Sequence, residues 1–152
     1  MLNPDFKVDN FNGSTGKFTF FLSHTHEDHL KGLKTEFNMP ITDWNKGVIY
    51  CSEVSKCLVL DRFKNLVKNV VSLQMNTEYQ IKGRAVTMIP SNHCPGAVMF
   101  VFKGPSGIVL HTGDFRFRPK MLTDLGLITK GKPIDYVHMD NTFATTEEEF
   151  PS

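Results

Sequence analysis

Four side chains that bind metals well are gathered within six residues of the chain: His24, His26, Asp28 and His29, in the run H-T-H-E-D-H. In an extended segment alternate side chains share one side, so His24, His26 and Asp28 project together and His29 follows them. Neutral imidazoles with a carboxylate suit zinc, and sites richer in oxygen suit manganese or iron. The spacing therefore predicts a metal centre.

Two later residues are candidates for the same centre. His93 stands in S-N-H-C-P-G and Asp114 in H-T-G-D-F-R, each after an apolar run and beside turn residues. A lone residue of this kind in a loop is more often a solvated or capping group. Next to the first motif, we interpret His93 and Asp114 as ligands.

The elements that must position these residues are mostly strands. Short apolar runs predict strands at 18–22, 48–51, 70–73, 85–89, 97–102, 108–111 and 136–139, and helical spacing predicts helices at 28–37 and 53–63. Most of the strands are apolar on both alternating faces, as in sheets covered by other layers. The pattern predicts a mixed α/β layered fold of one domain.

Composition limits the partners of the chain. Its 152 residues carry a formal charge of +1, which excludes a strongly basic protein that coats nucleic acid, so a contact with nucleic acid must be local. Basic residues gather after Asp114, where they either guide a DNA backbone or form a solvated face: Arg116, Arg118, Lys120, Lys130 and Lys132.

Compartment is indicated by what the sequence lacks. Its longest apolar run, 97–102, is six residues and cannot span a membrane, and the first residues show no signal peptide. The three cysteines form no C-x-x-C pair, which favours a reducing compartment. Cys94 beside His93 is interpreted as a packing residue, and His111 and His138 as core or edge histidines.

The motifs together resemble a known family. H-T-H-E-D-H, S-N-H-C-P-G-A-V-M-F, H-T-G-D-F-R and M-D-N-T-F are similar to successive motifs of the metallo-β-lactamase/β-CASP nucleases, in the DNA cross-link repair branch. The first motif alone marks only the wide superfamily, and the later ones are narrower. P-K-M-L at 119–122 and D-N-T at 140–142 most resemble the 5′ exonucleases of that branch.

This resemblance implies a metallo-β-lactamase-type αββα sandwich that is incomplete, with 1–152 forming its N-terminal part up to the start of the β-CASP module. A helix start at Thr145 and Thr146, with no helix after it, agrees with a longer parent, although a frayed polar tail is the alternative. The resemblance also implies the site roles. His24, His26 and His93 would hold a first metal, Asp28 and His29 a second, and Asp114 would bridge them. Asp140, in M-D-N-T-F, would act beside them, with Asp28, Asp114 and Asp140 as catalytic carboxylates. For Asp140 a plain strand-end aspartate is the alternative.

The implied function is a metal-dependent 5′→3′ DNA exonuclease in interstrand cross-link repair and DNA end processing, located in the nucleus. Its cofactor would be one or two zinc ions, with manganese or iron as alternatives, and its partner single-stranded or duplex DNA 5′ ends rather than a membrane. Two other readings stay open. One is a thioester or amide hydrolase of the wider superfamily, and the other is a truncated fragment that binds metal without turnover.

Overall fold

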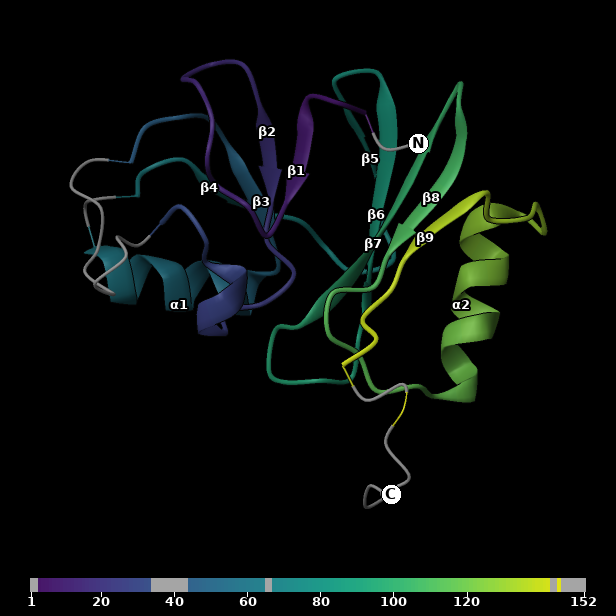
Figure 1. The fold of residues 1–152 in the computed structure, drawn as a ribbon. Helices are drawn as coiled ribbons and strands as arrows, with labels where there is room; N and C mark the ends of the chain where they lie inside the picture. Colours follow the sequence, from purple (N-terminus) through teal and green to yellow (C-terminus); the bar gives the residue numbers. More distant parts are fainter. Residues whose placement is uncertain (1–2, 34–43, 65–66, 143–144, 146–152) are drawn as a thin grey trace.

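The computed structural model describes residues 3–33, 44–64, 67–142 and 145. Two sheets face each other, and each carries a helix on its outer side, so the layers run α-β-β-α (Figure 1). This confirms the predicted metallo-β-lactamase-type layering.

The first sheet is parallel throughout, in the order β1 (Phe6–Val8), β2 (Thr19–Phe21), β3 (Ile49–Cys51) and β4 (Val70–Ser72). Helix α1 (Glu53–Phe63) connects β3 to β4. Parallel neighbours need such a crossover, because a tight hairpin cannot return the chain in the same direction. Val59 and Phe63 of α1 are buried against the outer face of this sheet.

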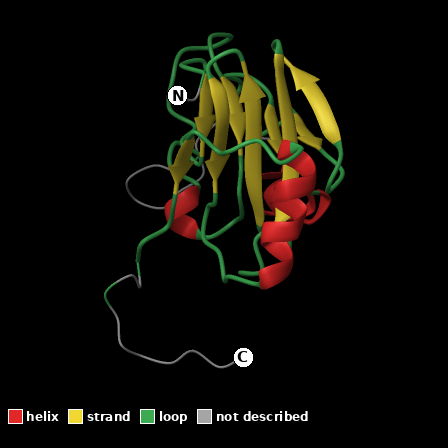
Figure 2. Ribbon diagram, turned by 90° about the vertical axis from the view of Figure 1, so that its right-hand side faces the viewer, coloured by secondary structure: helices red, strands yellow, loops and turns green. Residues whose placement is uncertain are grey.

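The second sheet is mainly antiparallel, in the order β5 (Glu78–Ile81), β6 (Arg84–Pro90), β7 (Val98–Gly104) and β8 (Gly107–His111). The strand β9 (Tyr136–His138) pairs parallel to β8, and α2 (Pro119–Thr129) forms the crossover between them. Figure 2 shows α2 lying against the outer face of this sheet, where Met121 packs with Met99 and Leu110.

Alternation along β2 explains how the layers are joined. Phe20 points to the α1 side, with its ring 5.1 Å from that of Trp44. Phe21 points to the second sheet, where its ring lies 5.4 Å from Phe100 and 5.0 Å from Phe102. Both phenylalanines are fully buried. A strand apolar on both faces is therefore what the middle of a four-layer sandwich requires.

The predicted strands are all present, with ends shifted by one or two residues, and the helix predicted at 53–63 is confirmed. The helix predicted at 28–37 is wrong over its described part. The chain there forms only a 3-10 turn, η1 (Glu27–His29); Lys31 then bridges to Asn10, and Gly32 has a φ of +96° with no room for a Cβ against the backbone of Phe11. Residues 34–37 and the helix start predicted at 145–149 lie outside the described residues, except Thr145.

Candidate metal centre

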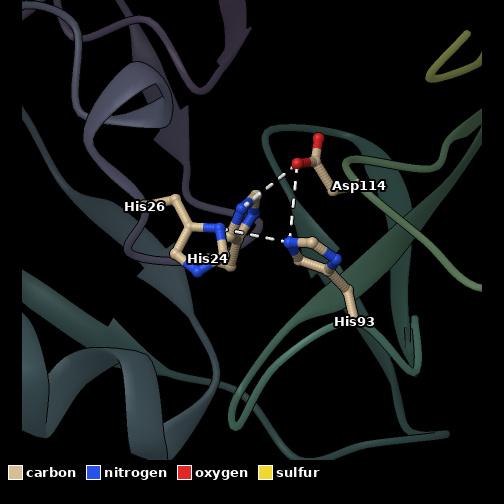
Figure 3. Close-up of side chains that lie close together, drawn as sticks. All are labelled: His24, His26, His93 and Asp114. Atoms are coloured by element: carbon tan, nitrogen blue, oxygen red, sulfur yellow. Dashed lines mark hydrogen bonds and ion pairs between the residues drawn. The ribbon is translucent and has the colours of Figure 1, made fainter. Parts of the chain in front are cut away.

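Three of the predicted ligands occupy equivalent places in the fold. His24, His93 and Asp114 each stand three residues after the last residue of a strand, β2, β6 and β8 respectively. Since β6 and β8 are both antiparallel to β7, their carboxyl ends lie at the same edge of the second sheet. His24 reaches this edge from the first sheet, so the centre lies between the two sheets (Figure 3).

Four ligand atoms converge at this point: one from each of His24, His26, His93 and Asp114, all within 4.8 Å of one another. His93 Nε2 lies 3.1 Å from His26 Nδ1 and 3.5 Å from Asp114 Oδ2. His24 Nε2 lies 3.6 Å from the same carboxylate oxygen. The structure therefore brings together two residues of the first motif and both of the later candidates.

The surroundings of the His24 imidazole indicate that this cluster fits a metal ion. Its side chain is fully buried, and its Nε2 has no hydrogen-bond partner among the described residues. Burial, together with the nearby His29, lowers the pKa of His24 to about 4, so the imidazole is neutral and Nε2 can carry a free lone pair. A buried, unsatisfied nitrogen is costly unless something binds it. Three imidazoles and one carboxylate are a donor set that zinc accepts.

A second group adjoins the first through Asp114. His29 Nε2 lies 3.1 Å from Asp114 Oδ1, the oxygen that the first group does not approach, and 3.4 Å from Asp28 Oδ2. The carboxylate of Asp28 is mostly exposed, whereas that of Asp114 is largely covered. Asp114 thus presents one oxygen to each group, which is the geometry that a bridging ligand needs.

Asp9 is a site residue that sequence reasoning missed. Its Oδ2 accepts hydrogen bonds from His29 Nδ1 at 2.8 Å and from the Ser23 hydroxyl at 2.6 Å, and its Oδ1 accepts from the Ser23 backbone N–H at 2.7 Å. Because the Ser23 hydroxyl donates to Asp9, its oxygen, 3.0 Å from His24 Nδ1, is placed to accept from His24. Both arrangements leave Nε2 of the imidazole turned to the centre.

Asp9 also changes the titration of His29. Burial lowers the pKa of His29. The hydrogen bond and negative charge of Asp9, together with the charge of Asp114, raise this pKa by a larger amount, so the net shift is upward. Asp9 follows β1, a strand of three residues, and has a φ of +52°. So short a strand has no visible periodicity, and the only sequence signal was a polar residue after F-K-V.

Asp140 lines an open cleft that also contains His29, His111, Asp114 and His138. Burial raises its pKa, but two hydrogen bonds from Thr142 to Oδ1, at 2.9 and 2.6 Å, outweigh this and the net shift is downward. Asp140 is therefore ionised near neutral pH and is better suited to accept a proton than to donate one. His111 accepts from the Gly113 N–H at 3.2 Å and stacks on His138, as expected for a satisfied edge histidine.

Cys94 and the basic residues after Asp114 were the remaining candidates from the sequence. Burial and the charge of Asp114 raise the pKa of the Cys94 thiol, which does not favour a nucleophilic role.

The basic residues that follow Asp114 in the sequence are divided by α2, a helix about 16 Å long at 1.5 Å per residue. Arg116 and Arg118 are exposed in the loop that follows Asp114, whereas Lys130 and Lys132 lie past the far end of the helix. The Arg116 N–H donates to the Ser91 carbonyl at 3.0 Å, beside the loop of His93, and Lys120 in the first turn of α2 pairs with Asp124 at 2.6 Å.

Sequence comparison relates the chain to DNA repair proteins. It is 38% identical over 157 residues to DNA ligase 6 of Arabidopsis thaliana, covering 99% of this chain and 11% of that protein. It is 35% identical to the human DNA cross-link repair 1A protein (97% and 13% covered) and 36% identical to the 5′ exonuclease Apollo of Gallus gallus (90% and 28%). The chain thus spans about a tenth to a quarter of these relatives, and the identities do not single out Apollo. No protein-family model matches the chain.

Solved structures agree on the fold. The metallo-β-lactamase fold protein YhfI of Bacillus subtilis aligns with a TM-score of 0.55 at 14% identity, covering 80% of this chain and 50% of that one. No helix among the described residues is long and apolar enough to cross a membrane. By sequence the chain is a relative of the DNA cross-link repair nucleases, and by fold it is part of a metallo-β-lactamase sandwich.

Proposed function

We propose that the chain carries the metal centre of a DNA nuclease that hydrolyses phosphodiester bonds. The observation that supports this most directly is the carboxylate of Asp114, which faces His24 and His93 with one oxygen and His29 with the other. The relatives named for DNA cross-link repair supply the substrate class. The finer proposal is a 5′→3′ exonuclease acting on single-stranded or duplex 5′ ends during cross-link repair in the nucleus.

Three histidines and Asp114 would hold the first metal ion, and His29, Asp28 and Asp114 a second one, with zinc as the proposed metal. Bound there, the metal would polarise a phosphodiester oxygen and lower the pKa of a water molecule to near neutral. The protein contributes oriented imidazoles, because Ser23 contacts His24 and Asp9 contacts His29 at the ring nitrogen that faces away from the centre. We assign proton acceptance to Asp140, which is ionised and lines the cleft, and attraction of the DNA backbone to the exposed Arg116 and Arg118.

We further propose that residues 1–152 correspond to the first part of a metallo-β-lactamase domain that leads into a β-CASP module. The chain covers only a small share of each relative, which supports a correspondence to part of a longer protein. We therefore assign metal binding to the residues described above and leave turnover to depend also on the rest of such a domain.

The test measures bound zinc and hydrolysis on one preparation. Substrates are 5′-phosphorylated single-stranded DNA, nicked duplex DNA and a thioester, each with the wild type and Asp114→Asn. Release of nucleotides from the 5′ end, lost in Asp114→Asn, supports the nuclease. Thioester cleavage alone supports the wider superfamily reading, and stoichiometric zinc without turnover supports a metal-binding segment. The absence of both bound zinc and hydrolysis would contradict the proposal.

A further inference from the structure

The loop that carries His93 is fastened to a helix of the other sheet. This loop, residues 91–97, joins β6 to β7 and is closed by a hydrogen bond from the Ser91 N–H to the Ala97 carbonyl at 3.1 Å. Near its end the carbonyl of Gly96 accepts from the Ser52 hydroxyl at 2.7 Å and from the Ser55 hydroxyl at 3.3 Å. One carbonyl of the loop therefore receives two hydroxyl donors.

Both donors belong to the first turn of α1. Ser52 is the N-cap residue, whose oxygen also accepts from the Ser55 N–H at 3.1 Å. Both serines are buried, with 2% and 0% of their surface exposed. The amino end of a helix carries a partial positive charge, which favours the carbonyl oxygen placed there. The two serine hydroxyls therefore bind the Gly96 carbonyl in addition to the capping bond that Ser52 makes within the helix.

The contact between loop and helix is close as well as polar. Gly96 has a φ of +82°, and a Cβ placed on it would lie 2.9 Å from the Cβ of Val54 and 3.1 Å from the Ser52 hydroxyl oxygen. Only glycine fits this position without displacement of the loop or of the helix. The sequence G-A after H-C-P thus keeps the loop seated on α1.

The contact between the His93 loop and α1 joins the two sheets that supply the ligands of the metal centre. His24 and His26 come from the first sheet, to which α1 belongs, and His93 comes from the second. Among the described residues a backbone hydrogen bond from Val98 to Ser23, 3.0 Å long, also joins these two parts. The ligand atoms of His26 and His93 lie 3.1 Å apart. Because they come from different sheets, a movement of one sheet relative to the other would separate these ligand atoms.

We propose that Ser52 and Ser55 are positioning residues of the metal centre, because their hydroxyls hold the loop of His93 at the distance from His24 and His26 that joint coordination needs. This inference rests on the proposed metal site. It assigns to two hydroxyls of α1 a role in metal affinity rather than in the chemistry.

The variants are Ser55→Ala, which leaves the cap of α1 intact, and the double variant Ser52→Ala/Ser55→Ala. Zinc affinity is measured by competition with a chromophoric chelator, and coordination geometry by the visible spectrum of the Co²⁺ form. We expect affinity to fall by roughly 10-fold in the double variant, as for other groups that orient metal ligands, less in Ser55→Ala, and the Co²⁺ spectrum to change in both. Ser52→Thr/Ser55→Ala keeps the hydroxyl donor and the cap at position 52, so its zinc affinity and Co²⁺ spectrum should return to those of Ser55→Ala.

Thr87→Val is the matched control, since it removes a buried hydroxyl of β6 that has no hydrogen-bond partner among the described residues. It should leave zinc affinity and spectrum unchanged. Unfolding with chelator present shows whether each variant is folded. Wild-type affinity and spectrum in the folded double variant would overturn the inference. Equal zinc binding by the wild type and His26→Ala would instead refute the proposed metal site.

Discussion

Asp9 Oδ2 and His29 Nδ1 lie 2.8 Å apart, and this hydrogen bond turns the opposite nitrogen of the imidazole toward Asp114, 3.1 Å away. The same carboxylate oxygen accepts from Ser23, whose hydroxyl oxygen meets the imidazole of His24. One residue after the first strand therefore orients an imidazole of each group in the centre. Such supporting partners set ligand direction and basicity.

Asp9→Asn should weaken zinc binding by roughly 10- to 100-fold, the usual cost of losing an orienting carboxylate. An amide keeps the size of the side chain but loses its charge and one acceptor oxygen. NMR titration of the zinc-free protein should show a lower pKa for His29, because Asp9 is what raises it. An unchanged zinc affinity would mean that His29 and Ser23 need no such support. Asp5→Asn, at the opposite end of β1, serves as the control.

His26→Ala should remove most of the bound zinc. Its Nδ1 lies within the converging group and 3.1 Å from His93 Nε2, so its loss leaves three ligand atoms and an open side. Elemental analysis after dialysis gives the stoichiometry. His138→Ala, at the exposed end of β9, should retain the metal. Full stoichiometry in His26→Ala is the result that contradicts the site.

His24 should make the zinc-free protein less stable as pH falls. Its folded pKa of about 4 lies below the unfolded value of 6.5, so between these values the unfolded chain binds more protons at this position. Its contribution to stability is complete above about pH 6.5 and is lost as pH falls toward 4.

Urea unfolding with chelator at several pH values, for the wild type and His24→Gln, isolates this term. The difference in unfolding free energy between the two proteins should shrink as the solution is acidified. His29, whose raised pKa acts in the opposite direction, is present in both proteins and largely cancels. A pH-independent difference is incompatible with a neutral, buried His24.

Phe21→Ala should destabilise the fold by about 3–5 kcal/mol, the usual cost of removing a buried phenyl ring. The ring is fully buried between the sheets and lies 5.0 Å from Phe6 and 5.0 Å from Phe102. Val71→Ala on β4, where the side chain is 42% exposed, should cost less than about 1 kcal/mol. Denaturant titration of both variants makes the comparison. Equal costs would show that the sheets do not depend on this contact.

Local patterns in the sequence determined much of this protein. The H-x-H-x-D-H run places ligands on one segment through chain geometry alone, and continuous apolar runs predicted the strands that precede His24, His93 and Asp114. The helix at 53–63 was visible for the same reason, because its helical spacing is a local pattern.

Only the tertiary structure decided how distant residues meet. His26 and His93, 67 positions apart, approach because two sheets pack face to face through Phe21, Phe100 and Phe102. Asp9 follows a strand too short to be recognised, and it acquires its role only when β1 pairs with β2. The helix predicted at 28–37 failed where Gly32 packs on the backbone of Phe11 and Asn12, a contact across the fold. Sequence patterns report the preferences of neighbouring residues, whereas the register of sheets and the orientation of side chains across them depend on long-range packing.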